Sequence, residues 1–152
     1  MSKSEIKPPR NGLKVLIVEN NPADAQLTLY ALKEAGLTEG VLSLPDGDEA
    51  LAYLHHEGKH SDASLPHIIF LDLNLPKKPG LIVLSELKVD PKLKVIPVIA
   101  VSGSDDPRQL RAAYELHANC FIHKPADLHE LIRFMRACYE FWGTVATLAS
   151  AA

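Results

Sequence analysis

Five short apolar segments alternate along the chain with segments that carry helix-start signals, and this alternation constrains the fold more than any other feature. The predicted strands are residues 14–18, 41–44, 68–71, 95–101 and 120–122. Strands that alternate with helices form a parallel sheet with helices on both of its faces. A chain of 152 residues has the length of one such domain. We therefore predict an α/β fold in which a five-stranded parallel sheet is flanked by five helices.

Side chains that cap helices stand where the predicted helices begin. Asn21 can cap the first helix, and Pro22 after it suits a first helical turn. Asp46 is followed three residues later by a Glu, which is the capping-box pattern. Asp106 and Asp127 are the predicted starts of the last two helices.

The composition indicates an ordinary globular protein. Apolar residues make up 47% of the chain and charged residues 23%. The net charge of −3 gives no indication of the basic surface that binds nucleic acid. The sequence shows no apolar stretch long enough to span a membrane and no signal peptide. We therefore expect a soluble, cytoplasmic protein with a flexible arm at 1–12, one domain at 13–142 and a tail at 143–152.

Asp72 directly follows the apolar run 68–71, which reads as a strand buried on both faces. A carboxylate at this place costs free energy unless it is paired or bound to a cation. In open α/β sheets, ligands bind at the carboxyl ends of the strands. Right-handed crossovers bring together the residues that follow strands one, three, four and five, and these are Glu19, Asn20, Asp72, Ser102 and Lys124.

These side chains make chemical sense as a site for phosphoryl transfer. An Asp carboxylate can attack phosphorus and form an acyl phosphate. Mg²⁺ often lies between one or two carboxylates and a phosphate, and Glu19 and Asp72 could supply the carboxylates. Lys124 can bind one phosphoryl oxygen as a point charge, and the Ser102 hydroxyl can donate to another.

At this point the sequence closely resembles the receiver domains of two-component response regulators. The resemblance runs from about residue 13 to residue 141 and rests on four motifs. They are Leu-Ile-Val-Glu-Asn at 16–20, Leu-Asp-Leu-Asn-Leu-Pro at 71–76 with Gly80, Val-Ser-Gly at 101–103, and His-Lys-Pro at 123–125. The resemblance implies a flavodoxin-like receiver fold with strand order 2-1-3-4-5.

The family also implies a role for each matching position. Asp72 would accept a phosphoryl group from a sensor histidine kinase, so the chain would be no enzyme beyond slow self-dephosphorylation at most. Glu19, Asp72 and the main-chain carbonyl of Asn74 would hold Mg²⁺. Lys124 would pair with the phosphoryl group, and the bond between Lys124 and Pro125 would be cis.

Two further positions are implied to switch, and one departs from the family pattern. Ser102 would move toward the phosphoryl group, and Phe121 fills the place of the aromatic residue that turns inward; Phe121 could also be a plain core aromatic. Receivers usually carry two acidic residues after strand one, whereas here the second is Asn20. As a Mg²⁺ ligand Asn20 would offer only a neutral amide oxygen, so we expect weaker Mg²⁺ binding than a two-acid site gives.

The last predicted helix offers a candidate partner surface, since nothing after the receiver is large enough for an output domain. Its helical stripe, predicted to face the core, is Leu128, Leu131, Ile132, Met135, Cys138 and Trp142. Phe134, Tyr139 and Phe141 fall off this stripe, which indicates an outer face that binds a partner.

A finer resemblance connects the chain to the small response regulators paired with cyanobacterial and bacterial phytochromes. It rests on the Phe141–Trp142 ending, the segment 71–76 and the longer loop before strand three. It implies a bacteriophytochrome as the kinase. It also implies a homodimer that uses the face from strand five to the tail, with Phe134, Tyr139, Phe141 and Trp142 in the interface.

Three other interpretations compete with a working receiver. Asn20 would suit a pseudo-receiver that is never phosphorylated and acts as a binding or dimerisation module. A hydrolase of the aspartyl-phosphate type would need a second Asp two residues after the nucleophile, and Asn74 cannot do that acid–base work. A flavin-binding fold would need phosphate-cradling glycines after strand one, where the sequence has Glu19, Asn20 and Asn21.

Overall fold

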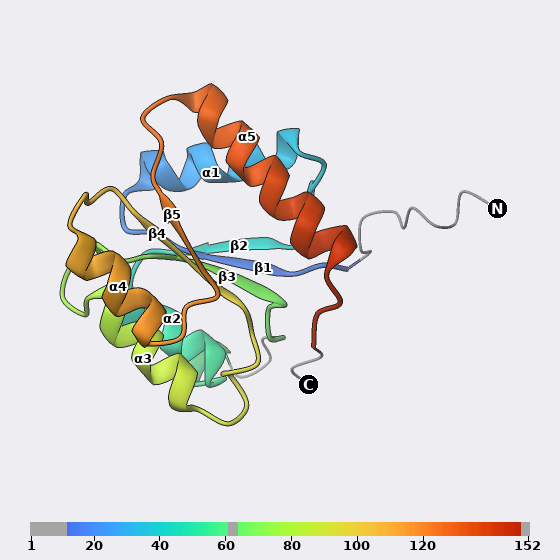
Figure 1. Ribbon diagram of the computed structural model, residues 1–152. Helices are drawn as coiled ribbons and strands as arrows, with labels where there is room; N and C mark the ends of the chain where they lie inside the picture. The colour runs from blue at the N-terminus through green and yellow to red at the C-terminus, as the bar shows by residue number, and fades with distance from the viewer. Residues whose placement is uncertain (1–11, 61–63, 150–152) are drawn as a thin grey trace.

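The computed structural model describes residues 12–60 and 64–149, so nearly all of the predicted arm at 1–12 lies outside the described residues. Its centre is a single parallel sheet in the order β2-β1-β3-β4-β5 (Figure 1). The strands are β1 (Val15–Val18), β2 (Val41–Leu44), β3 (Ile68–Asp72), β4 (Val98–Ser102) and β5 (Cys120–His123). The predicted fold class and strand order are confirmed.

Helices cover both faces of the sheet (Figure 1). One face carries α1 (Pro22–Glu34) and α5 (Leu128–Glu140), and α5 continues into a π-helical turn, η3 (Phe141–Val145). The other face carries α2 (Gly47–Leu54), α3 (Gly80–Val89) and α4 (Pro107–Glu115), with a short 3₁₀ turn, η2 (Gly58–His60), after α2. Within the described residues, no helix is long and apolar enough to cross a bilayer.

The predicted helix caps are confirmed by their hydrogen bonds. The side chains of Asn21, Asp46, Asp106 and Asp127 each accept a main-chain N–H from the first turn of α1, α2, α4 and α5. Each cap satisfies donors that a helix start would leave unpaired. These bonds fix where the helices leave the loops at the carboxyl edge of the sheet.

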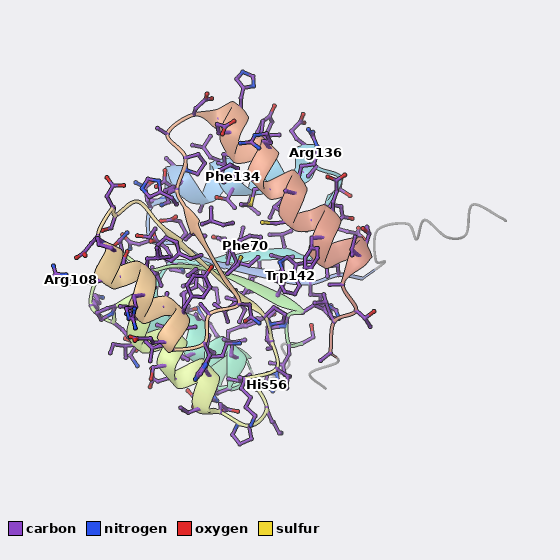
Figure 2. The ribbon with its side chains drawn as sticks, in the orientation of Figure 1. His56, Phe70, Arg108, Phe134, Arg136 and Trp142 are labelled. Atoms are coloured by element: carbon purple, nitrogen blue, oxygen red, sulfur yellow. The ribbon has the colours of Figure 1, made fainter. Side chains whose placement is uncertain are left out.

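The continuous apolar run of β3 is explained by its burial between two cores. Ile69 and Leu71 pack on the side of α2, α3 and α4. Ile68 and Phe70 pack on the side of α1 and α5, and Phe70 is labelled in Figure 2. Side chains alternate along a strand, so a strand covered on both faces must be apolar throughout. Asp72 continues this run and is itself buried.

The strand register decides which side chains meet at the carboxyl edge. Val18 pairs with Leu71, so the residues that follow them, Glu19 and Asp72, lie next to each other. Ser102 pairs with His123, so Lys124 follows directly beside it. The ladder thus places the ends of β1, β3, β4 and β5 in one line.

One strand begins later than predicted. β4 begins at Val98 rather than at residue 95, because the chain before it is held in a loop. The ammonium of Lys88, which is half-buried at the end of α3, donates to the main-chain oxygens of Lys94 (3.2 Å) and Ile96 (3.0 Å). Carbonyls bonded in this way take no part in the ladder, and Val95 is left exposed.

The predicted facing of α5 is wrong at two positions. Tyr139, expected on the outer face, is only 7% exposed, and its ring lies against Gly36 and Gly143. Residues three and four positions apart lie on the same face of a helix. Cys138 and Tyr139 follow the buried Met135 by three and four residues, so both belong on the core face. Leu128, expected in the core, is 40% exposed because it lies in the first turn of the helix.

Gly80 at the start of α3 supports the position of Asp72, and its substitution tests how tightly this end of the sheet is packed. A Cβ at Gly80 would lie 2.4 Å from the main-chain oxygen of Asp72 and 2.5 Å from the Cα of Leu73. Backbone cannot yield as a flexible side chain can, so α3 or the end of β3 must move. We predict that Gly80→Ala lowers the free energy of unfolding by about 2 kcal/mol or more.

Urea unfolding of Gly80→Ala beside Gly103→Ala measures this effect. A Cβ at Gly103 would meet nothing within 4 Å, so that variant controls for the general effect of replacing glycine by alanine. Equal and small losses in the two variants would contradict the close contact of α3 with β3.

Candidate functional site

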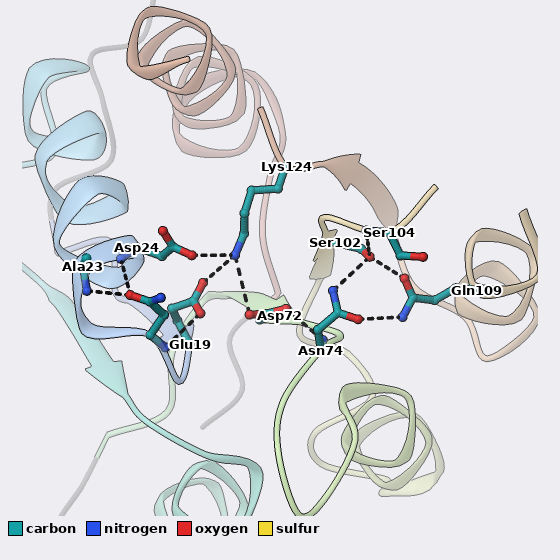
Figure 3. Close-up of polar contacts among 10 residues, drawn as sticks. Glu19, Ala23, Asp24, Asp72, Asn74, Ser102, Ser104, Gln109 and Lys124 are labelled. Carbon is teal, nitrogen blue, oxygen red and sulfur yellow. Dashed lines mark hydrogen bonds and ion pairs between the residues drawn. The ribbon is translucent and has the colours of Figure 1, made fainter. Parts of the chain in front are cut away.

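Four polar side chains gather at the carboxyl edge of the sheet, each at the end of a different strand. Glu19 follows β1, Asp72 ends β3, Ser102 ends β4 and Lys124 follows β5 (Figure 3). Glu19 is 7% exposed, Asp72 is 6% exposed and Ser102 is completely buried. The structure therefore brings together the residues that the strand ends predicted to be neighbours, and it buries two carboxylates among them.

Lys124 is the cation at the centre of this group (Figure 3). Its Nζ donates to Glu19 Oε1 at 3.0 Å and to Asp24 Oδ2 at 3.2 Å. The same Nζ forms an ion pair with Asp72 Oδ2 at 3.6 Å. One ammonium thus faces three carboxylates, and a buried carboxylate without such a partner would be strongly destabilising.

Main-chain donors fix the remaining oxygens of the two buried carboxylates. The N–H of Asn21 donates to Glu19 Oε2 at 3.1 Å. The N–H of Asn74 donates to Asp72 Oδ1 at 2.8 Å. In each carboxylate one oxygen is therefore held by the backbone and the other is directed at Lys124. The oxygens near Lys124 are the ones that can exchange it for another cation or an electrophile.

Burial and mutual repulsion make ionisation of this pair difficult. Burial, together with hydrogen bonding to Asp72 and the negative charge of Asp72, raises the pKa of Glu19 to about 7, although the Asn21 N–H and Lys124 act in the opposite direction. Burial by itself would lower the pKa of Lys124, but Glu19, Asp72 and Asp24 outweigh it and raise that pKa. The site therefore holds a firmly charged ammonium beside more negative charge than it can neutralise.

Ser102 belongs to a second network on the other side of Asp72 (Figure 3). Its hydroxyl donates to the Oε1 of Gln109 and accepts from the Nδ2 of Asn74 (3.3 Å) and the N–H of Ser104 (3.0 Å). The Nε2 of Gln109 donates to the Oδ1 of Asn74 at 3.2 Å, which closes a ring of three side chains. Among the described residues, the Ser102 hydroxyl makes no hydrogen bond with Asp72.

The other predicted site residues lie nearby in different surroundings. Phe121 is partly buried against the core beneath α2, α3 and α4, and its main-chain N–H donates to the Tyr114 hydroxyl at 3.0 Å. Asn20 is exposed. The bond between Lys124 and Pro125 is trans, so the prediction of a cis bond is wrong. The trans form is the more stable isomer of X–Pro bonds by about 0.5–1 kcal/mol.

Two residues of the site were not predicted from the sequence. Asp24 lies in the first turn of α1, and Gln109 lies in the first turn of α4. Both helices start at the carboxyl edge of the sheet, so polar residues in their first turns could have been predicted to lie near the site from their position alone. Nothing in the residue types themselves separates Asp24 and Gln109 from ordinary solvated helix residues.

The donors present suit a hard divalent cation. Glu19 and Asp72 offer carboxylate oxygens, and the main-chain carbonyl of Asn74 follows Asp72 by two residues. Oxygen ligands of this kind are those that Mg²⁺ prefers. Among the described residues, no three His, Cys, Asp or Glu side chains are arranged to hold a metal by themselves. A cation here would therefore rely on the two carboxylates, the carbonyl and water or a phosphate.

The free space beside these carboxylates suits a small group. A cavity of about 60 Å³ lies next to Lys124 and continues inward between α1 and α5, where Leu27, Phe70 and Met135 line it. Sites for cofactors of the size of a flavin occupy about 300–1,000 Å³. The cavity therefore argues against the flavin-binding interpretation and leaves room for an ion or a phosphoryl group.

Comparisons with known proteins agree with this geometry. The family profile described as the response regulator receiver domain matches residues 15–136. Response regulator Rcp1 of Synechocystis sp. is 37% identical over 147 residues, which cover 97% of this chain and 98% of that protein.

Solved structures give the same result. The phosphorylated cyanobacterial phytochrome response regulator RcpA is similar with a TM-score of 0.87 and 45% identity, covering 91% of this chain and 99% of that chain. The Mn²⁺-bound form of response regulator Rcp1 is similar with a TM-score of 0.84 and 37% identity, covering 93% and 99%.

The raised pKa of Glu19 predicts a pH dependence of stability in the metal-free protein. A carboxyl group whose folded pKa lies above its unfolded value of 4.5 stabilises the fold fully below pH 4.5, and this contribution is lost as the pH rises through 7. The shift corresponds to at most about 3 kcal/mol. We predict that Glu19→Gln removes this loss, so that the variant gains stability over the parent protein between pH 5 and pH 8.

Urea unfolding in EDTA at several pH values measures the difference. Other titrating groups are common to both proteins, so subtracting the two curves isolates Glu19. Parallel curves for parent and variant would show that Glu19 is ionised in the fold at pH 5.

Proposed function

Because the chain belongs to the receiver-domain family of response regulators, we propose that it accepts a phosphoryl group on Asp72 from a sensor histidine kinase. The main support for this proposal is the way in which the Asp72 carboxylate is buried and oriented. Its Oδ1 is fixed by the Asn74 N–H, and its Oδ2 lies 3.6 Å from Lys124 in the small cavity at the sheet edge. A buried, oriented carboxylate beside a cation is prepared to attack phosphorus.

The proposed reaction is a transfer between two side chains. The Oδ2 of Asp72 forms a bond to the phosphorus of a phosphohistidine on the kinase. The bond between that phosphorus and the imidazole nitrogen breaks, and the nitrogen keeps the electron pair. The product is an acyl phosphate on Asp72. The chain thus supplies the acceptor, whereas catalysis of a separate substrate is not part of the proposal.

The surrounding residues have distinct parts in this proposal. Lys124 would leave Glu19 and Asp24 to pair with a phosphoryl oxygen, and Ser102 would donate to another. Glu19, Asp72 and the Asn74 carbonyl would hold Mg²⁺, which neutralises charge on the phosphoryl oxygens when it is bound. The manganese in the similar Rcp1 structure supports a divalent cation site in this fold.

A phytochrome-type histidine kinase, such as a bacteriophytochrome, is the proposed donor. The name of RcpA associates that similar protein with a cyanobacterial phytochrome. The proposed output is a change in the binding of proteins, and it is supported by the similarity to response regulator Rcp1, 98% of whose length this chain covers. Nucleic acid and membranes are not proposed as partners.

Intact-protein mass after incubation with acetyl phosphate and Mg²⁺ tests the proposal. The parent protein is expected to gain the mass of one phosphoryl group, and Asp72→Ala is expected to gain none. A gain of mass in both proteins would show that a residue other than Asp72 accepts the phosphoryl group. No gain in the parent, with acetyl phosphate or with a phosphorylated phytochrome kinase, would favour a pseudo-receiver that binds its partners without phosphorylation.

Asn20 is the residue that favours the pseudo-receiver alternative, and its effect on Mg²⁺ binding can be tested separately. A neutral amide replaces one of the two acids that receivers usually carry after the first strand. We predict that Asn20→Asp tightens Mg²⁺ binding about tenfold, because the cation gains a negative ligand.

Calorimetric titration with MgCl₂ measures the affinity, with Asn21→Asp as the matched control. The Asn21 side chain is engaged in capping α1, where it accepts from the N–H groups of Ala23 and Asp24, and Asp caps a helix as well as Asn does. That control adds the same charge one residue away. Equal affinities in the parent protein and Asn20→Asp would remove the basis for a weakened metal site.

We further propose a homodimer through the face from β5 to the end of α5 and η3. Phe141 is 50% exposed and meets Trp142 in an edge-to-face contact with 5.1 Å between ring centroids. Phe134 on α5 is partly buried, whereas the buried Tyr139 would support this surface from below. Val145 in η3 is 70% exposed, so apolar surface continues past α5.

Light scattering at micromolar concentration tests the dimer. We predict a dimer for the parent protein and about a thirtyfold weaker association for Phe141→Lys, as removing a central aromatic residue of an interface commonly weakens binding by about 2 kcal/mol. Val89→Lys, at a 75% exposed position on α3, should remain a dimer. A monomeric parent protein would contradict the proposal.

A further inference from the structure

The helix α4 is attached to the rest of the molecule by few contacts. Ala113 is its one buried residue among the nine of Pro107–Glu115. Leu110 and Tyr114, which are 40% and 48% exposed, leave much of its apolar surface uncovered. A helix with so small a buried face depends on individual polar contacts for its position.

Two such contacts join α4 to the site, one near each end. Near its start, Gln109 bonds to Ser102 and to Asn74. Near its end, the hydroxyl of Tyr114 accepts the main-chain N–H of Phe121 in β5 at 3.0 Å. The helix is therefore attached to Ser102 and Phe121, the two residues that the resemblance to receiver domains implies to switch.

The contact with Gln109 excludes the contact that phosphorylation would require. A serine hydroxyl has a single proton to donate. In this structure that proton is donated to the Oε1 of Gln109, while Asn74 and Ser104 donate to the oxygen. Ser102 is completely buried, so solvent water cannot replace Gln109 or a phosphoryl oxygen as the acceptor of its proton. The hydroxyl can donate to Gln109 or to a phosphoryl oxygen on Asp72, but not to both.

We propose that Gln109 is a positioning residue: it latches the Ser102 hydroxyl in the unphosphorylated protein, and α4 is released when Ser102 turns to the phosphoryl group. This inference rests on the proposed function of Asp72. Turning the hydroxyl breaks the bond to Gln109 and opens the ring that Gln109 forms with Asn74. The start of α4 then keeps only the hydrogen bond from Gln109 to Asn74, so a change at Asp72 loosens α4 and reaches its outer surface.

The latch predicts that removing Gln109 favours the phosphorylated conformation. Gln109→Met keeps the length of the side chain and helix propensity but has no amide. The hydroxyl of Ser102 no longer has to give up a hydrogen bond before it turns. Affinity for beryllium fluoride, a mimic of a phosphoryl group on Asp, is expected to rise about fivefold in the presence of Mg²⁺, the factor that one hydrogen bond of about 1 kcal/mol gives.

Titration calorimetry measures this affinity in the parent protein, Gln109→Met and Arg111→Leu. Arg111 lies on the same helix, exposed and paired with Glu115 at 3.1 Å, so Arg111→Leu should bind as the parent protein does. In a Ser102→Ala background, Gln109→Met should have no effect on the affinity, because the group that it latches is gone. A purely structural role of Gln109 would give the same effect in both backgrounds.

Amide spectra of the unliganded proteins give a second readout. In Gln109→Met the resonances of α4 should move part of the way along the path that beryllium fluoride produces in the parent protein. An unchanged affinity and unmoved α4 resonances would overturn the latch. If the parent protein binds beryllium fluoride no better than Asp72→Ala does, the proposed function fails instead, so the two failures can be distinguished.

Discussion

The ion cluster of Lys124 with three carboxylates is the interaction on which the rest of the site depends. Two of those carboxylates are almost completely buried, and Glu19 and Asp72 are brought together by the register of β1 with β3. Two buried carboxylates in contact repel each other, so they need a cation between them or a proton on one of them. Lys124 supplies that cation from β5, at distances of 3.0 Å and 3.6 Å. The fold thus stores an excess of negative charge that a metal ion and a phosphoryl group would relieve.

The helices and loops around the cluster follow from the same constraint. Main-chain N–H groups of Asn21 and Asn74 hold one oxygen of each buried carboxylate, and Asn21 also caps α1. The start of α3 packs so closely on the end of β3 that position 80 has room only for a glycine. On the other side of Asp72, hydrogen bonds join the side chains of Ser102, Asn74 and Gln109 in a ring. A change in the charge on Asp72 would therefore be felt by α1, α3 and α4 together.

The sequence predicted the fold and the acidic centre well because both depend on strong local signals. Apolar strands and capping residues determine the element order, and strand ends placed Glu19, Asp72 and Lys124 together. The predictions failed where tertiary contacts decide. Lys88 holds the loop before β4 through hydrogen bonds, and the core face of α5 includes Tyr139. Asp24 and Gln109 were missed because their types and spacing are those of ordinary helix surfaces.

A crystal structure with Mg²⁺ and beryllium fluoride would show whether Lys124 holds the site until a phosphoryl group arrives on Asp72. We predict the beryllium atom on Asp72 Oδ2, with Lys124 Nζ moved from Asp24 and Glu19 to a fluoride. The same structure should show Ser102 bonded to a second fluoride and Mg²⁺ on Glu19, Asp72 and the Asn74 carbonyl. A mimic bound at Asp72 while Lys124 stays on Glu19 and Asp24 would show that Lys124 does not respond to the phosphoryl group.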